Sequence, residues 1–545
     1  MRILRNRIFT FLVLFLLSVL LIVGCGQGSG QQQVEVQAPP SVATEVQAVP
    51  TKASKSDVFV FLMNHLPENI DPHVRDDSPS WTVFEGLYDT LVDYKPGAME
   101  LEPELATAWE MSSDSTVFTF HLRQGVKFHD GTEFDATAVK ANYERMRELN
   151  VGNAFMFTMV NRVEVPDPFT VKFVLDVPFA AFTENLAWLP IASPVAIKEH
   201  ANDGEKGIAW WAENGVGTGP YTVEKFARGE EIILRRFEQY WRGWKGGHVT
   251  TFVLRQVPES ATQRAMLERG EAHLGSNFSF DDLEDMKANS NLMVYSFPSI
   301  RQYYHVYNTR KDPLTNQKVR QALALAFDYE TYVKDVLQGY ALQPKGLLPE
   351  VMRQHDDSLP LQEGNLDKAK QLLAEAGYPG GGFELEFMYL ESYEWQRLTA
   401  ELTRDQLAKI GITLKLVGQP WATIVERMKD PARRPDIASV LVYPTTSSAD
   451  TLLWPMYHTD SGHFANFGFS DSEIDRLLEE ARQTSDSAKR DEIYIKLQRL
   501  LAEKVPTVAR ATFTVNWVTA SNVKGLVLQQ MRPLVPPLYS IHIQE

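Results

Sequence analysis

Four aromatic residues in the second half of the sequence lie at positions where they could contact a ligand. Trp395, Trp421, Tyr443 and Trp454 each lie at or shortly after the end of a segment that we expect to be a β-strand. Aromatic faces pack against apolar side chains or sugar rings, and the hydroxyl groups of residues 445–448 could bond the polar groups of the same ligand. Because aromatic residues also dominate protein cores, the alternative is that half or more of the four are buried.

The sequence lacks the residue patterns of common enzymes. It contains no His-Glu-x-x-His, no Gly-x-Ser-x-Gly and no P-loop. The glycine-rich residues 215–219 precede Pro-Tyr and a predicted strand, whereas a phosphate-binding loop would precede a helix. The single cysteine, Cys25, excludes a disulfide within the chain and any cysteine-based metal site. We therefore expect a protein that is not an enzyme and uses no cofactor or metal.

Alternating strands and helices are predicted to position the four aromatic residues. Residues 383–389, 412–417 and 437–443 have strand character, and helices are expected at 394–410 and 421–429. This βαβαβ order is typical of a mostly parallel sheet covered by helices, in which ligands bind beyond the carboxyl ends of the strands. The segments predicted to lie near a pocket are therefore 389–395, 418–421 and 443–454.

Local signals in the rest of the sequence predict further elements. Residues 57–63 are expected to form a strand with Asn64 and His65 on its exit loop, and the alternation of residues 116–123 predicts a half-buried strand. Asp135 and Asn365 are suited to cap the helices that follow them. The first half therefore has an α+β pattern.

Residues 1–24 have the features of a secretory signal peptide. Arg2, Arg5 and Arg7 precede the uncharged residues 8–23, and Gly24-Cys25 follows. The uncharged run is shorter than the roughly 18 residues of a membrane-spanning helix, although a permanent anchor helix is the alternative. Residues 26–56 are rich in Gly, Gln, Pro and Ser and lack aromatic residues, which predicts a flexible tether.

Length and charge narrow the class of protein further. The rest of the sequence is too long for one ordinary core, so we expect two or three lobes. The formal net charge is −16 and no basic cluster is present, which argues against nucleic-acid binding.

Several short blocks of the sequence match a known family pattern. They are 84–92 (FEGLYDTLV), 105–110 (LATAWE), 118–131 (FTFHLRQGVKFHDG), 217–221 (GTGPY), 319–323 (VRQAL) and 374–378 (AEAGY). In this order the blocks resemble extracellular solute-binding family 5, the dipeptide-, oligopeptide- and nickel-binding lipoproteins of ABC importers. Residues 22–25 (IVGC) likewise resemble the lipobox of bacterial lipoproteins, in which Cys25 would be diacylated.

The resemblance implies an α/β, two-lobed, periplasmic-binding-protein-like fold of type II with an extra subdomain, a hinge and an interlobe cleft. Lobe I would comprise residues 57–80, 195–298 and 505–545. The extra subdomain would be residues 81–194, and lobe II residues 299–504.

The function implied by the resemblance is that of a substrate-binding lipoprotein. It would capture an extracellular solute, peptide-class by family, and deliver it to the permease and ATPase subunits of an ABC importer. We expect a monomer, exported and lipid-anchored at the periplasmic or extracellular face of the cell membrane. A neutral oligosaccharide is the alternative ligand, and a sensor or scaffold lipoprotein is the alternative function.

The resemblance also implies where ligand charges would be met. In dipeptide-binding relatives an arginine holds the ligand carboxylate and an acidic residue holds its α-amino group. These positions fall at Leu390 and Thr445, which carry no charge. Asp450 could replace the acidic residue, although it matches more naturally a second acidic position of the loop. Longer peptides or neutral ligands are therefore favoured over dipeptides.

Two further sites follow from the same relatives. Asn64 and His65 would lie on a loop that lines the cleft, as ligand contacts or as loop residues only. Because nickel-binding relatives exist, the histidine pair His458 and His463 leaves a metal as a minor alternative.

Overall fold

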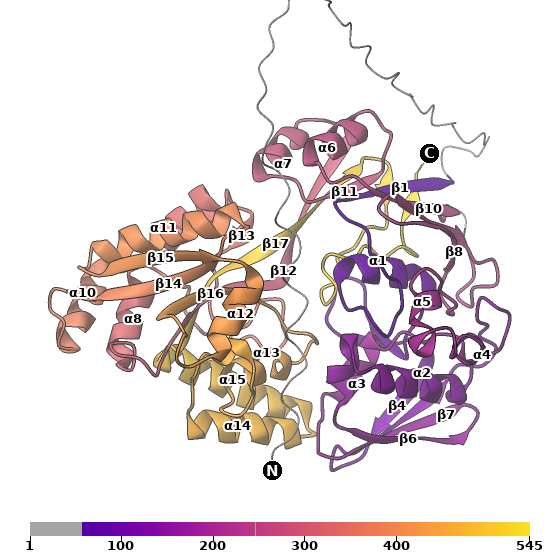
Figure 1. Cartoon of the computed structure of the whole chain (residues 1–545), viewed down its shortest axis with the longest axis horizontal. Coiled ribbons are helices and arrows are strands. Elements are labelled where there is room, and N and C mark those ends of the chain that lie inside the picture. Colours follow the sequence, from indigo (N-terminus) through magenta and orange to yellow (C-terminus); the bar gives the residue numbers. More distant parts are fainter. Residues whose placement is uncertain (1–56, 246, 545) are drawn as a thin grey trace, which may run out of the picture. The chain divides into compact units, whose positions relative to one another are not determined.

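The computed structural model describes residues 57–245 and 247–544, so Cys25, the predicted signal peptide and the predicted tether lie outside the described residues. An 11-stranded sheet runs through the described part of the chain (Figure 1). Its strands are, in spatial order, β15 (Thr413–Gln419), β14 (Glu384–Leu390), β16 (Ile437–Val442), β12 (Leu292–Tyr307), β17 (Thr507–Ala520), β11 (Leu274–Ser276), β1 (Val58–Met63), β10 (Thr251–Gln256), β9 (Glu231–Arg236) and β8 (Tyr221–Ala227), with β13 (Ala341–Leu342) paired to β17.

The two longest strands, β12 and β17, connect the two parts of this sheet. They pair antiparallel, and their register shifts between Pro298 and Gln302. Before the shift, β12 runs beside the part of β17 that also pairs with β11. After the shift, β12 pairs with β16 on its other side. The register shift therefore lies where the chain crosses from one part of the sheet to the other.

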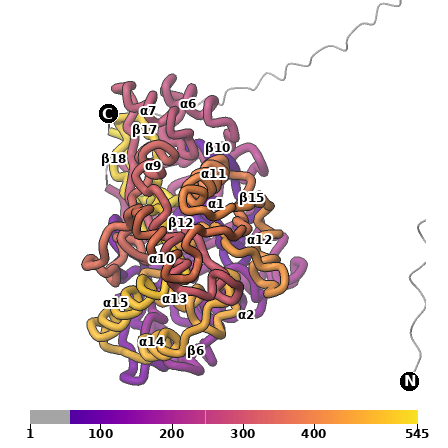
Figure 2. The backbone as a smooth tube through the Cα atoms, turned by 90° about the vertical axis from the view of Figure 1, so that its left-hand side faces the viewer, coloured from indigo at the N-terminus to yellow at the C-terminus, as the bar shows by residue number. Residues whose placement is uncertain are grey.

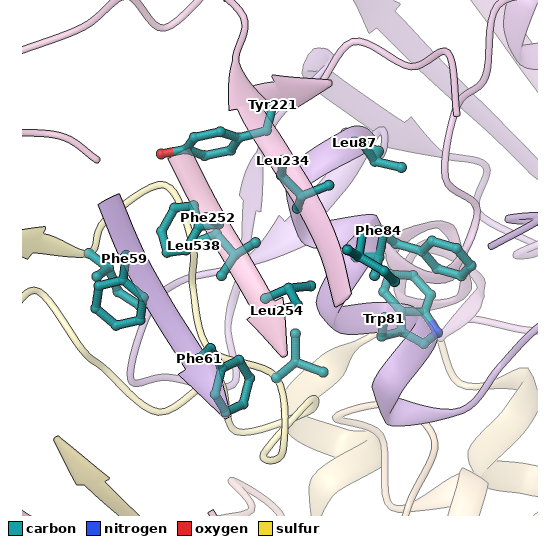
Figure 3. Close-up of a cluster of buried hydrophobic side chains, with 14 of the residues drawn as sticks. Phe59, Phe61, Trp81, Phe84, Leu87, Tyr221, Leu234, Phe252, Leu254 and Leu538 are labelled. Carbon is teal, nitrogen blue, oxygen red and sulfur yellow. The ribbon is translucent and has the colours of Figure 1, made fainter. Parts of the chain in front are cut away.

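The first part of the sheet contains β1, β8, β9, β10 and β11 and has a core on each face. Helix α1 (Ser78–Leu87) packs its aromatic residues Trp81 and Phe84 against one face, where Phe59, Leu234 and Phe252 are fully buried (Figure 3). Helices α6 (Ser260–Glu268) and α7 (Phe280–Lys287) contribute to the second core.

The glycine-rich residues 215–219 are a close-packed turn and not a phosphate loop. Side chains at Gly217 and Gly219 would collide with the backbone of Leu87 at the end of α1. Glycine is needed here because only a residue without Cβ permits two backbones to approach this closely.

A separate four-stranded antiparallel sheet lies between residues 106 and 175. Its order is β4 (Ala106–Met111), β5 (Val117–Leu122), β7 (Thr170–Leu175) and β6 (Val160–Asp167). Phe118 and Phe120 alternate toward a core that they share with helix α2 (Ala136–Leu149). The predicted alternation of this strand and the predicted cap of this helix are confirmed, since Asp135 accepts hydrogen bonds from the N–H groups of Thr137 and Ala138.

The second part of the sheet is the predicted βαβαβ unit, and this prediction is confirmed. Strand β14 is parallel to both β15 and β16. Helices α8 (Gln317–Leu325), α10 (Leu366–Glu375) and α11 (Glu394–Ala408) share a core on one face. The core on the other face contains α12 (Trp421–Lys429), α13 (Asp450–Tyr457), α14 (Ser472–Gln483) and α15 (Ser487–Lys504), and Figure 2 shows α14 beside α15.

Short elements complete the described chain. They are β2 (Val92–Tyr94), β3 (Leu101–Pro103), α3 (Phe182–Asn185), α4 (Pro194–Glu199), α5 (Ile208–Trp211), α9 (Tyr329–Thr331), β18 (Val523–Lys524), β19 (His542–Ile543) and the helical turns Gly152–Phe157, Leu186–Trp188, Glu205–Gly207, Tyr332–Val336 and Phe464–Asn466. Within residues 57–245 and 247–544, every helix is too short or too polar to span a bilayer.

Candidate ligand-binding site

The carboxyl ends of the parallel strands β14 and β15 lie together, because Leu390 and Gln419 are paired at their last positions. The buried side chain of Gln396 ties this edge to the neighbouring strand β16. Its Oε1 accepts hydrogen bonds from the N–H of Leu390 (3.1 Å) and from the hydroxyl of Ser439 (3.1 Å). The side chain of Leu390 packs against the core below. This edge is the region in which the sequence predicts ligand contacts.

The predicted aromatic residues divide by exposure. Tyr443 is 49% exposed and Trp421 is 43% exposed, with the edge of Phe464 packed on Trp421 at 5.3 Å between ring centres. Trp395 is partly buried and packs on Tyr303 and Phe513 at 4.9 and 4.7 Å.

Trp454 is partly buried. It stacks on His458 at 3.7 Å, and the guanidinium carbon of Arg482 lies 3.3 Å from its ring centre. Tyr443 and Trp421 therefore have free surface for a ligand, Trp395 has some, and both faces of Trp454 are occupied.

The loop after β16 contacts distant segments of the chain. The N–H of Ser448 donates a hydrogen bond of 2.7 Å to Oε2 of Glu184, and the N–H of Ser447 donates one of 3.3 Å to the hydroxyl of Tyr94. Burial raises the pKa of Glu184, while hydrogen bonds from this loop oppose that rise. Thr445 is half-buried, at the start of the same loop.

The carboxylate of Asp450, the candidate replacement for a ligand-binding acidic residue, is already bonded to another residue of the protein. Its two oxygens accept hydrogen bonds of 2.9 and 2.8 Å from Arg482, and its side chain is buried. Such a two-point guanidinium–carboxylate pair is strong and directional. This geometry favours a role for Asp450 in holding α13 against α14.

Asn64 and His65 follow β1, in the other part of the sheet. Asn64 is half-buried and His65 is exposed, and neither side chain forms a hydrogen bond with any other described residue. The next residue, Leu66, donates its N–H to Oε1 of Gln256 at 3.1 Å, which fixes the loop. The two side chains are free to contact a ligand, but no hydrogen bond or aromatic contact among the described residues joins them to Trp421 or Tyr443.

Sequence reasoning missed three residues of this region. Tyr393 is 49% exposed and stacks on Trp395 at 5.9 Å between ring centres. Glu184 reaches the loop after β16, and Arg301 lies in β12 where its register shifts. Tyr393 could have been found from its place in the segment 389–395, whereas the other two depend on contacts between segments far apart in sequence.

A hollow of about 670 Å³, open to solvent, lies beside α1 and the C-terminal segment, and Tyr94 is among its lining residues. All of its acidic side chains except Glu102 have hydrogen-bond partners within the described chain. Asp89 accepts hydrogen bonds from Tyr240 and Trp241, and Glu104 pairs with Arg242 at 2.6 Å. Because four of the five acidic side chains have partners within the protein, the hollow is best explained as a structural polar network. No group of three His, Cys, Asp or Glu side chains suited to a metal ion occurs in the described part of the chain.

Solved structures share this architecture. HbpA2 of Haemophilus parasuis superposes with a TM-score of 0.81 at 26% identity, covering 90% of this chain and 100% of that one. The periplasmic binding protein DppA of Helicobacter pylori, solved with the peptide STSA, gives a TM-score of 0.73 at 26% identity and covers 90% and 98%. The chain therefore has the mixed α/β, two-lobed fold of periplasmic solute-binding proteins, as predicted.

Sequence comparisons define the family within this class. The pattern described as "Bacterial extracellular solute-binding proteins, family 5 Middle" matches residues 100–464. A probable D,D-dipeptide-binding periplasmic protein of Escherichia coli K12 is 31% identical over 85% of this chain and 90% of its own. A glutathione-binding protein of Pectobacterium atrosepticum is 31% identical over 82% and 86%. The chain belongs to family 5 of the bacterial extracellular solute-binding proteins, which bind solutes for transport and are not enzymes.

Proposed function

We propose that this protein is the substrate-binding lipoprotein of an ABC importer. It captures a peptide-class solute between two lobes and delivers it, chemically intact, to the permease and ATPase subunits. Lobe I, the extra subdomain and lobe II would have the residue ranges predicted from the sequence, except that helix α1 (Ser78–Leu87) packs in the core of lobe I. A diacylated Cys25 keeps the protein at the outer face of the cell membrane, because two acyl chains give stable anchoring.

The register shift between β12 and β17 is the observation that carries this proposal. Ladder hydrogen bonds are interrupted between Pro298 and Gln302, at the crossing between the two parts of the sheet. Such an interruption bends more easily than a regular ladder, which supports a hinge at this point. A solute that contacts both lobes then stabilises the closed form by its differential affinity for closed over open.

The peptide class of the solute is supported by the relatives and by the exposed aromatic residues. The names of both curated relatives contain a dipeptide or glutathione, and the Helicobacter pylori neighbour holds a peptide. Tyr443 and Trp421 offer exposed aromatic faces, against which peptide side chains can pack.

Native mass spectrometry tests this function. Purified protein would be incubated with one pool of synthetic tri- to pentapeptides and, separately, with one pool of neutral oligosaccharides. The expected result is a 1:1 complex with members of the peptide pool, recovered with unchanged mass after hours of incubation. Retention of oligosaccharides alone would overturn the peptide class, and retention from neither pool or sustained conversion of peptides would overturn the function.

A further inference from the structure

Arg301 occupies an unusual backbone position. Pro298 pairs with Thr514 and Gln302 pairs with Thr512, so residues 299–301 of β12 together stand opposite Phe513 alone. The excess length forms a bulge, and bulges turn side chains away from the regular pleat.

Two groups fix the shape of this bulge. The hydroxyl of Ser299 donates a hydrogen bond of 2.6 Å to the carbonyl of Phe513 and accepts one of 3.2 Å from the N–H of Arg301. Ile300 is fully buried against Tyr94 and Met531. These contacts orient residues 299–301 at the crossing between the two parts of the sheet.

The register of the neighbouring strand places Arg301 beside the candidate site. Gln302 pairs with Val442 and Tyr303 with Leu441, so continuing the same antiparallel register sets Arg301 opposite Tyr443. Burial lowers the pKa of Arg301, and the hydroxyl groups of Tyr443 and Tyr393 are near enough to oppose that change. Arg301 thus lies among the exposed aromatic residues at the ends of β14 and β16.

The guanidinium of Arg301 has no partner within the described residues. It takes part in no ion pair and no side-chain hydrogen bond there, although it is partly buried. Among other enclosed arginines, Arg145 and Arg482 bond to Asp71 and Asp450. The buried Arg320 and Arg510 have no carboxylate partner, but carbonyl, imidazole and hydroxyl groups accept their hydrogen bonds. A desolvated cation without a counter-charge is unfavourable, and an anionic ligand would remove that cost.

The surroundings favour one kind of anion. A guanidinium offers paired N–H donors that match the two oxygens of a carboxylate. Tyr393 stacks on Trp395, which in turn packs on Phe513 opposite the bulge, so an aromatic surface adjoins the cation. A carboxylate carried next to an apolar side chain, as at the C-terminus of a peptide, fits both features.

We propose that Arg301 binds the carboxylate of the captured solute, with Tyr393 and Tyr443 flanking it, and so selects solutes that carry a free carboxylate. This inference rests on the proposed function and names the ligand group that the site recognises. The cation comes from β12, and not from the end of β14, where Leu390 stands. The absence of a charge at Leu390 therefore does not make the site neutral.

The test compares two peptide libraries that differ in one group. Tri- to pentapeptides without Asp or Glu would be synthesised with free C-termini and with amidated C-termini, and retention by the protein would be measured by native mass spectrometry. We expect the wild type to prefer the carboxylate library by about tenfold or more. R301Q should lose that preference, and R301K should keep part of it. The control R404Q, which removes an exposed charge on the outer side of α11, should behave as the wild type.

The outcomes separate the two proposals. Equal retention of both libraries by the wild type, or an unchanged preference in R301Q, overturns the role of Arg301 and leaves the proposed function standing. Retention of neither library overturns the proposed function and this role with it. Melting temperatures of R301Q and R404Q would check that both variants are folded. We expect values close to that of the wild type, because Arg301 has no partner within the described chain that the substitution would remove.

Discussion

The carboxylate of Glu184 accepts a hydrogen bond of 2.7 Å from the backbone N–H of Ser448, although 264 positions separate the two residues in the sequence. Glu184 lies in α3, within the range predicted for the extra subdomain, and Ser448 lies just before α13, within the range predicted for lobe II. The hydrogen bond of Ser447 to Tyr94 joins the same ranges. In this structure, the predicted extra subdomain therefore contacts the predicted lobe II through these two hydrogen bonds.

Substituting Glu184 by alanine should loosen this contact. Loss of this acceptor leaves the N–H of Ser448 without its partner, at a cost of roughly 1–3 kcal/mol, so the amide of Ser448 should exchange hydrogen about tenfold faster or more. Hydrogen exchange with mass spectrometry would measure this. E164A, which removes an exposed carboxylate of β6, serves as the control. Unchanged exchange in E184A would show that the contact does not hold the segments together in solution.

Glu85 should make the protein less stable as the pH rises. Burial raises the pKa of Glu85 from 4.5 to about 7, with Arg532 opposing the rise. Between these values the folded protein retains a proton that the unfolded chain has lost, so the free energy of unfolding falls as pH increases through this window. E85Q should remove this contribution, which amounts to up to about 3 kcal/mol at pH 8 relative to pH 4.

Urea unfolding of the wild type and E85Q at several pH values between 4 and 8 measures this difference. Other titrating groups are the same in both proteins, so their contributions cancel in the comparison. One of them is His73, whose pKa burial lowers to about 3, so that its contribution reduces the free energy of unfolding as the pH falls. Parallel pH profiles for the two proteins would contradict the role of Glu85.

Removing the charge of Asp450 should lower the free energy of unfolding. D450N leaves Arg482 without its counter-charge, and because Asp450 is buried while Arg482 is partly exposed, we expect a loss of about 1–3 kcal/mol. D405N, which breaks an exposed pair with Arg404, should change stability by less than about 0.5 kcal/mol. If thermal unfolding of D450N matches the wild type while peptide retention is lost, Asp450 contacts the ligand instead.

Removing the ring of Trp421 should weaken ligand binding and change the melting temperature only slightly. Its ring is 43% exposed and packs mainly against Phe464, so W421A should lower the melting temperature by no more than about 2–3 °C. Peptide retention should fall severalfold if the exposed face meets the solute. A large drop in melting temperature with normal retention would assign Trp421 to the core.

Sequence patterns predicted the parallel unit well because its signals are local. Asn365 caps α10 as expected, accepting a hydrogen bond from Lys368, and Gly411 has the positive φ of 79° that ends the segment after α11. The strand β12 was not predicted, because Pro298 interrupts its pattern and its partner β17 lies about two hundred positions later. Pairing between strands so far apart in the sequence produces no recognisable pattern in the residues of either strand.

For the candidate site, the sequence predicted the strand ends but not the packing of the side chains around them. Tyr443 and Trp421 are exposed at the expected strand ends, whereas Trp454 is covered by Arg482 from α14. Nothing near Trp454 in the sequence indicates that cover. Arg301 was not predicted, because its position depends on a bulge in β12 opposite Phe513, and Phe513 belongs to the distant strand β17.

The most direct test of the central claim is the distance between the two predicted halves with and without solute. Because Cys25 is the only cysteine, a C25S background accepts spin labels at two chosen sites, for which K140C on α2 and E480C on α14 are suitable exposed positions. Electron–electron double resonance would record the distance distribution before and after saturation with a retained peptide. The account predicts that peptide shifts the population to a shorter distance. Superimposable distributions at saturating peptide would contradict it.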